Sequence, residues 1–159
     1  MNSSPKLLEF APGVWPALME DLRRRGRGVR ESGAFLLGRQ RAGVRAVTQW
    51  LPYEQLDAGA LNFDYVRLES AAFGRLWDVC AARGLEPVAD VHTHPFGPRQ
   101  SGSDREHPMI SLAGHVAMIV PRFAQVRVLP VDVSVNVYLG GGRWESHFER
   151  EAQARIALL

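Results

Sequence analysis

The chain has 159 residues, of which 46% are hydrophobic and 23% charged, and its formal net charge is +2. This length suffices for one domain with its own core, and the composition is that of an ordinary globular protein. So small a net charge, carried by arginines spread along the chain, argues against a nucleic-acid partner.

The cysteine count and the hydropathy pattern limit where the protein works. Cys80 is the only cysteine, so there is no internal disulfide and no cysteine-only metal site. No apolar run is long enough to span a bilayer. Residues 1–10 lack the basic, apolar and small-residue layout of a signal peptide. We therefore expect a cytoplasmic protein without a membrane partner.

The first half of the chain mixes strand and helix patterns. Helical spacing of apolar residues alternates with short apolar runs between glycines and prolines. We expect Asp64 and Gly84 to cap the longest helix. The predicted elements are a short strand at 7–10, a helix at 15–25, a hairpin of strands 31–37 and 44–51, a loop at 52–62, and a helix at 64–83.

The second half is richer in strands. Runs of valine and other apolar residues predict them, and three consecutive glycines at 140–142 predict a turn. The predicted elements are strands at 85–91, 115–120, 126–133, 135–139 and 143–148, then a short terminal helix or fraying tail at 150–159. The fold class is therefore mixed α/β, with one mixed sheet flanked by helices over residues 1–159.

One segment carries residues suited to metal binding. His92 and His94 project from the end of the predicted strand 85–91, and side chains two residues apart on a strand point to the same face. Pro95 favours departure from the sheet directly afterwards. Asp104 follows at the start of a predicted helix. Two imidazoles and one carboxylate leave a tetrahedral zinc ion one open position, as catalytic zinc sites do.

Asp104 also suits a helix start. The sequence Ser103-Asp104-Arg105-Glu106 has the form of a capping box with Ser103 as N-cap, and this role does not exclude metal binding. A zinc hydrolase also needs a general base and a donor that stabilises an oxyanion. Glu31, which opens an otherwise apolar strand, is the candidate base, and Ser101 is the candidate donor.

Other titratable residues leave alternatives open. Asp90, on the expected face of the histidines, is a candidate partner for an imidazole N–H. Single histidines at three other positions are expected at the surface or in loops. The competitors of Glu31 as base are Glu54, Asp57, Glu69, Glu86 and Asp90, and the single histidines are His107, His115 and His147.

These residues resemble a known motif. Glu31, then His92-Thr93-His94-Pro95, then Ser101-Gly102-Ser103-Asp104 resemble the JAMM motif of MPN/JAB-domain zinc metalloproteases, in its prokaryotic JAB branch. The strand from Glu31 to Gly38 resembles that family's first strand, with Ala34 in place of a usual glycine. The resemblance covers residues 31–120 and implies one MPN/JAB-like domain with a curved mixed sheet of cytidine-deaminase-like architecture.

The resemblance also implies a function. His92, His94 and Asp104 would bind one Zn²⁺ together with a catalytic water, Glu31 would act as general acid and base, and Ser101 would stabilise the oxyanion. The reaction would be hydrolysis of a peptide or isopeptide bond after the C-terminal glycine of a ubiquitin-like protein. E1-like and E2-like proteins would be further partners, and bacterial antiphage defence or sulfur-carrier metabolism the context.

Two alternatives differ from this hypothesis. One is a non-catalytic MPN scaffold that binds a partner protein, although such scaffolds usually lose the metal ligands that this sequence keeps. The other is a zinc amidohydrolase that acts on a small peptide or metabolite with the same site chemistry. The residues do not distinguish a linear peptide bond from an isopeptide bond, nor do they define the oligomeric state.

Overall fold

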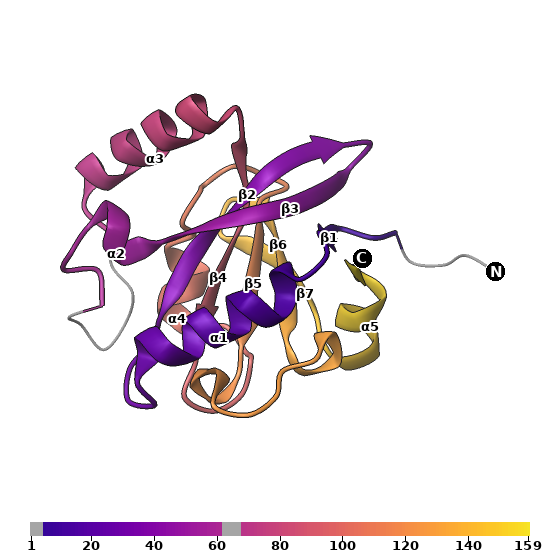
Figure 1. Cartoon of the computed structure of the whole chain (residues 1–159). Coiled ribbons are helices and arrows are strands. Elements are labelled where there is room, and N and C mark those ends of the chain that lie inside the picture. Colours follow the sequence, from indigo (N-terminus) through magenta and orange to yellow (C-terminus); the bar gives the residue numbers. More distant parts are fainter. Residues whose placement is uncertain (1–4, 62–67) are drawn as a thin grey trace.

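The computed structural model describes residues 5–61 and 68–159, which form a curled mixed sheet with helices on both sides (Figure 1). Its helices are α1 (Val14–Gly26), α2 (Tyr53–Leu56), α3 (Ser70–Arg83), α4 (Gly102–Glu106) and α5 (Glu149–Ala154), with 3₁₀ turns η1 (Arg122–Ala124) and η2 (Pro130–Asp132). Its strands are β1 (Leu8–Phe10), β2 (Gly33–Arg41), β3 (Val44–Pro52), β4 (Glu86–Thr93), β5 (Val116–Val120), β6 (Ser134–Gly140), β7 (Arg143–His147) and β8 (Ile156–Leu158).

The strands of the described residues lie in the order β7-β6-β5-β4-β2-β3-β1-β8. The predicted hairpin of β2 and β3 is antiparallel, as are the pairs β2-β4, β5-β6 and β6-β7. The pairs β4-β5, β1-β3 and β1-β8 are parallel. Parallel and antiparallel pairing in one sheet with helices on its faces confirms the predicted mixed α/β class.

Strand β2 separates two hydrophobic clusters, because its successive side chains point to opposite faces. Ala34 and Leu36 pack in the cluster that includes α1, whereas Phe35 and Leu37 pack in the cluster that includes α3. All four side chains are fully buried. The sheet is therefore covered by α1 on one face and by α3 on the other.

Helix α3 covers only part of its face of the sheet. Its buried residues, Ala72, Leu76 and Cys80, pack with side chains of β2 and β3. Strands β4 and β5 lie beyond β2 in the sheet order, next to β6 and β7. The α3 face of β4 and β5 is the part of the sheet on which the candidate site lies.

Of two predicted elements at the C-terminal end, one is wrong and the other is right only in part. Residues 126–133 are not a strand, because Pro130 starts the 3₁₀ turn η2 and supplies no N–H to a sheet. The apolar pattern there instead reflects burial of Val128 and Val133 under α1. The predicted short terminal helix is present as α5, but the chain after it forms β8, which pairs in parallel with β1.

The structure shifts the bounds of two elements before β4. The predicted loop 52–62 contains the single turn α2, which buries Tyr53 and Leu56. Helix α3 begins at Ser70 with Glu69 as N-cap, later than predicted, although Gly84 is its C-cap as expected. Asp64, the predicted N-cap, lies outside the described residues.

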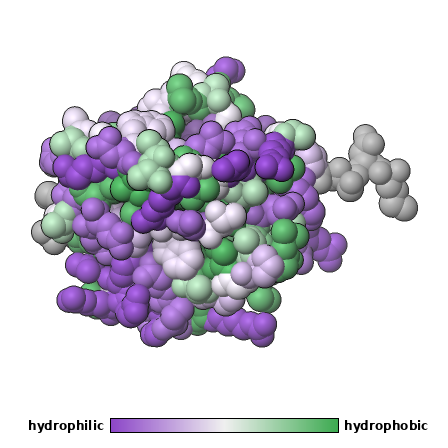
Figure 2. All heavy atoms as spheres, turned by 45° about the horizontal axis from the view of Figure 1, so that its top comes forward, coloured by the Kyte–Doolittle hydropathy of each residue, from purple (hydrophilic) through white to green (hydrophobic). Residues whose placement is uncertain are grey.

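The surface is mixed in character. Figure 2 shows one face on which apolar side chains lie between hydrophilic ones rather than in one continuous area. In the part of the chain that the structure describes, none of the helices has the length and apolar character needed to cross a membrane.

Candidate metal centre

The two histidines of the motif lie together at the end of β4. His92 is the second-last residue of β4, and His94 follows the strand directly. Both residues are 8% exposed, and their Nε2 atoms are 3.0 Å apart. The predicted shared face is confirmed: Thr93 between them points to the other side, as alternation along a strand requires.

His94 is held by its backbone although β4 ends before it. Its N–H donates to the carbonyl of Val120 over 2.9 Å, and its carbonyl accepts from the N–H of Phe123 over 2.9 Å. Phe123 belongs to a turn, Arg122–Ala124, whose three residues have φ values of 54°, 52° and 57°. Left-handed backbone costs about 1–2 kcal/mol per non-glycine residue, so the surrounding contacts must hold this turn in place.

Asp104 is fixed by a capping box at the start of α4. Ser101, not the predicted Ser103, is the N-cap. The Ser101 N–H donates to Asp104 Oδ2 over 2.8 Å, and the Asp104 N–H donates to Ser101 Oγ over 3.1 Å. The helix starts two residues earlier than predicted because an aspartate can close the box as well as Glu106 could. The bond from the Ser101 N–H restricts the rotamer of the Asp104 side chain.

The three side chains fit a tetrahedral zinc ion. Asp104 Oδ1 is 3.3 Å from His92 Nε2, and Asp104 Oδ2 is 3.0 Å from His94 Nε2. Zinc bonds of about 2.0–2.2 Å at the tetrahedral angle place ligand atoms about 3.3–3.6 Å apart. The observed separations of 3.0–3.3 Å are close to this spacing. Two imidazoles and one carboxylate are also the donor set expected of catalytic zinc.

The electrostatics of the cluster show how strongly its charges interact. Burial alone would lower the pKa of His92, but the hydrogen bond and charge of Asp104 outweigh burial and raise it. Burial would raise the pKa of Asp104, but hydrogen bonds from His92 and His94 lower it far below its usual range. The carboxylate is therefore ionised at neutral pH, as a metal ligand must be.

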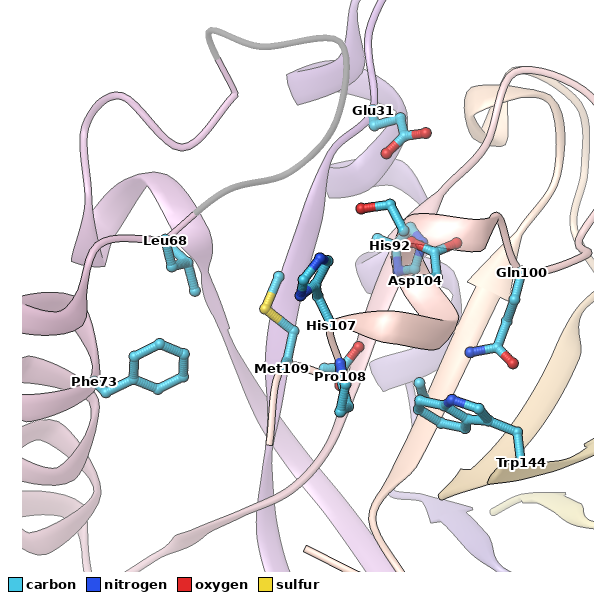
Figure 3. Close-up of a pocket in the computed structure, with 13 residues that line it drawn as sticks. Glu31, Leu68, Phe73, His92, Gln100, Asp104, His107, Pro108, Met109 and Trp144 are labelled. Carbon is cyan, nitrogen blue, oxygen red and sulfur yellow. The ribbon is translucent and has the colours of Figure 1, made fainter. Parts of the chain in front are cut away.

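Glu31 lies on the open side of this cluster. Its carboxylate Oε1 is 3.9 Å from His94 Nε2, and its side chain is 16% exposed. One ligand atom from each of Glu31, His92 and His94 lies within 4.8 Å of the others, so these three residues also form a group that could hold a metal ion. Figure 3 shows the Glu31 carboxylate above His92 and Asp104.

Two residues that the sequence analysis missed place Glu31. Ser32 is fully buried; its N–H donates to Thr93 Oγ1 over 3.0 Å, and its carbonyl accepts from the Thr93 N–H over 2.9 Å. The Ser32 hydroxyl donates to the carbonyl of Leu22 in α1. The residue between the two histidines thus ties the Glu31 segment to β4. The signal in the sequence was the pair of small hydroxyl residues beside Glu31 and between the histidines.

Gly33 follows and allows a close approach. Its backbone pairs with His92 in the sheet. A Cβ atom at Gly33 would lie 2.4 Å from the ring of Tyr53 and 2.7 Å from the carbonyl oxygen of Val91. The absent side chain therefore makes room for the buried Tyr53 ring, which packs with Phe35 on the face of the sheet that carries the candidate ligand His92.

Asp90 and the single histidines occupy different environments. Asp90 does contact an imidazole, but it is that of His115, whose Nε2 is 2.5 Å from Asp90 Oδ2. His115 and His147 are 7% and 5% exposed, so the prediction that they lie at the surface is wrong. Their burial is compensated by carboxylates, Asp90 for His115 and Glu145 for His147. The His107 side chain is 76% exposed, as predicted.

The competing carboxylates have structural partners. Glu54 accepts from Arg25, and Glu86 accepts from the Gln40 N–H. Asp57 accepts from the N–H groups of Gly59 and Glu69, which lowers its pKa. Of these candidate bases, Asp90 and Glu31 line a cavity at the candidate metal centre.

A cavity of about 550 Å³ begins at the metal centre (Figure 3). One end is lined by Glu31, His92 and Asp104. The rest of its lining comes from α3 and the residue two before it, from β4, β5 and β7, and from α4 with its flanking segments. These residues are Leu68, Phe73, Asp90, Gln100, Ser103, His107, Pro108, Met109, Ala117 and Trp144. Ligand and active sites typically occupy cavities of about 300–1,000 Å³.

The comparison with protein families agrees with the motif. The family of prokaryotic homologs of the JAB domain matches residues 14–135, which include Glu31, His92, His94 and Asp104. The chain belongs to this family. The JAB-domain family includes hydrolases.

Solved structures of similar fold come from bacteria and an archaeon. A protein from Desulfitobacterium hafniense superposes with a TM-score of 0.64 at 16% identity, covering 95% of this chain and 92% of its own. A protein from Salinibacter ruber gives 0.52 at 23% identity, covering 84% and 86%. A JAB1/MPN domain protein from Archaeoglobus fulgidus gives 0.48 at 14% identity, covering 94% and 98%. The first two share the JAB fold of this chain across nearly the whole domain.

Proposed function

We propose that the protein is a zinc-dependent peptidase or isopeptidase of the JAMM type, which cleaves after the C-terminal glycine of a ubiquitin-like protein. The observation that carries the proposal is the convergence of three side chains: the Nε2 atoms of His92 and His94 are 3.0 Å apart, and each lies 3.0–3.3 Å from an oxygen of the Asp104 carboxylate. A scaffold without catalytic function has no need of donors arranged so closely around one point. The Glu31 carboxylate on the open side of the cluster supports hydrolysis specifically.

The residues of the cluster would divide the chemistry among them. His92, His94 and Asp104 would hold the zinc ion, which supplies a Lewis acid and lowers the pKa of water to about 7. Glu31 would accept the proton of the attacking water and return it to the nitrogen of the leaving amine. Its carboxylate lies 3.9 Å from His94 Nε2, which is near enough to accept a proton from a water held at the open position beside the cluster.

Ser101 would act on the substrate oxygen. Its Oγ accepts the Asp104 N–H, which uses a lone pair and leaves the hydroxyl proton available for a second bond. A developing oxyanion on the scissile carbonyl is the acceptor that would profit most. The same serine would thus fix the ligand Asp104 and stabilise negative charge on the substrate oxygen. Removing one such donor from an enzyme typically lowers its turnover rate by about 10²–10³-fold.

The first experiment measures zinc and cleavage together. The probe is ubiquitin fused through its C-terminal glycine to a fluorescent protein, and zinc is counted by atomic emission on protein purified without chelator. We expect one zinc per chain and cleavage that a chelator abolishes and zinc restores. Glu31→Gln should keep its zinc but lose at least about 10²-fold in rate, because proton transfer is lost and the ligands stay.

Two variants make the result specific. Asp104→Asn should lose both zinc and cleavage, because a neutral amide is a poor ligand for zinc. Glu106→Gln on the same helix α4, with a side chain that is 77% exposed, should behave as wild type. A Glu31→Gln protein as fast as wild type would contradict the role of Glu31, and a wild-type protein without zinc would favour the scaffold.

The proposal includes a partner protein, the ubiquitin-like substrate. A ubiquitin-like protein supplied together with E1-like and E2-like enzymes would provide isopeptide conjugates, and a precursor of the same protein would provide a linear bond. An antiphage defence system is one setting that supplies such a set. The fusion probe tests the linear bond, and a lysine-linked conjugate of the same ubiquitin tests the isopeptide bond.

A further inference from the structure

The cavity beside the metal centre has two different ends. The catalytic end is formed by Glu31, His92 and Asp104, and the far end is mostly apolar. Figure 3 shows Phe73 and Leu68 on one side, Trp144 on the other, and Met109 and Pro108 between them. Since the catalytic groups and the apolar groups line one continuous space, whatever occupies the far end lies directly beside the reacting bond.

The apolar side chains are fixed by their own contacts. Phe73 stacks edge-on against Phe35, with ring centroids 6.1 Å apart, and so belongs to the cluster under α3. The Trp144 Nε1 donates to the carbonyl of Arg105 at the end of α4 over 2.9 Å, and its ring packs against Tyr138. Two aromatic walls held in this way form a preorganised pocket.

The floor of the cavity comes from the central strands. Asp90 in β4 and Ala117 in β5 are register partners in the parallel pair, so their side chains share the face of His92. Ala117 has a small side chain, and its methyl group leaves space in the cavity that a larger residue at this position would fill. Asp90 is 2% exposed, and its Oδ2 lies 2.5 Å from the Nε2 of His115, which is not part of the cavity lining.

We infer that this cavity is a specificity pocket for a large apolar side chain, aromatic or branched aliphatic, on a residue adjacent to the scissile bond. The inference rests on the proposed hydrolysis. A tail that ends in glycine has no side chain to fill about 550 Å³, so a substrate with glycine on one side of the bond would bring the large residue on the other. Burying such a side chain would raise kcat/KM about 10- to 100-fold over glycine.

The test uses two series of internally quenched peptides. In one series the residue before the scissile bond is glycine and the residue after it is glycine, leucine, phenylalanine or lysine; in the other these positions are exchanged. We expect phenylalanine and leucine to exceed glycine and lysine by about 10- to 100-fold in one series. Equal rates for all four residues in both series, or a preference for lysine, would overturn the inference.

Substitutions locate the preference in the cavity. Phe73→Ala removes a wall, so the ratio of phenylalanine to glycine cleavage should fall about tenfold. Trp77→Ala on the same helix, 51% exposed and outside the cavity, is the matched control and should leave the ratio unchanged. Ala117→Leu fills the floor and should lower the rate on phenylalanine more than on glycine. If neither Phe73→Ala nor Ala117→Leu changed the ratio of phenylalanine to glycine cleavage, the cavity would not be the source of the preference and the inference would be wrong.

A binding measurement separates this inference from the proposed function. The ε-methyl NMR signal of Met109, in zinc-loaded protein labelled at methionine, reports on the cavity without any turnover. N-acetyl-phenylalaninamide should shift this signal and N-acetyl-glycinamide should not, with Met19 in α1 as the internal reference. A shift without cleavage of any peptide would contradict only the proposed hydrolysis. Absence of a shift with active enzyme would contradict only the pocket.

Discussion

Gly33 is the residue whose replacement should disturb the metal centre most directly without removing a ligand. The new Cβ of Gly33→Ala would meet the Tyr53 ring at 2.4 Å and the Val91 carbonyl at 2.7 Å, next to the backbone of His92. Overpacking of this kind costs about 1–3 kcal/mol. We expect a lower free energy of unfolding, measured in urea, together with weaker zinc binding.

The matched control for this prediction is another glycine. Gly74 lies within α3, and a Cβ there would have nothing within 4 Å. Gly74→Ala should therefore stabilise the protein by about 0.5–1 kcal/mol through helix propensity and leave zinc binding unchanged. If both alanine variants lost stability equally, the close approach at Gly33 would not be the cause.

At the scale of single residues, strand alternation was the most informative pattern. It predicted that His92 and His94 share a face, and their Nε2 atoms lie 3.0 Å apart. It did not predict the bonds between Ser32 and Thr93 or the burial of His115, because each depends on a partner far along the chain. The N-cap at Ser101 was misplaced because two serines precede Asp104, and local sequence does not choose between them.

At the scale of elements, one arginine connects α1, β2 and α2. Arg25 pairs with Asp21 in α1 and Glu54 in α2, and its Nη1 donates to the carbonyl of Gly33. Its side chain is 12% exposed. Arg25→Ala would leave two carboxylates and a carbonyl without this donor, so we expect a loss of about 1–3 kcal/mol in the free energy of unfolding.

The neighbouring arginine provides the comparison. Arg24 contacts the same Asp21, but its side chain is 74% exposed. Exposed ion pairs contribute about 0–1 kcal/mol, so Arg24→Ala should cost little in the same urea titration. If both variants lost the same free energy of unfolding, the contribution of Arg25 would come from its charge alone and not from its buried hydrogen bonds. The sequence predicted only that a helix ends at Arg25, because Glu54 and Gly33, two of the partners of Arg25, lie in other elements.

Element type was predictable where the hydrophobic periodicity agreed with the positions of the glycines and prolines that end helices and strands. The hairpin of β2 and β3, helix α1 and strand β5 appear where the sequence places them. Residues 126–133 failed because alternating valines look alike in a strand and in a loop that buries them singly. The strand β8 was missed because three residues carry too little pattern, and β8 exists through pairing with β1.

At the scale of the whole molecule, the residues of the candidate metal centre come from distant parts of the sequence. His92 and His94 lie at the end of β4, Asp104 lies in the first turn of α4, and Glu31 precedes β2. The order of strands puts β4 beside β2, which is what brings the Glu31 segment to the histidines. The motif indicated this proximity through its family resemblance, whereas propensity and periodicity contain no information on which strands are neighbours.

A metal ion that links these segments should stabilise the entire fold. Zinc bound by the folded state alone would add about 2.7 kcal/mol at a free concentration of 100 times Kd. For a domain of this size, that corresponds to a rise of about 5–10 °C in Tm. We expect calorimetry to show this rise when zinc is added to chelator-treated protein, increasing with the logarithm of zinc concentration.

Asp104→Asn should show no such dependence of Tm on zinc, while Glu31→Gln should keep it, since the Glu31 carboxylate is assigned to proton transfer. Loss of the zinc dependence in Glu31→Gln would instead make Glu31 a ligand, which the proximity of its carboxylate to both histidines would then explain.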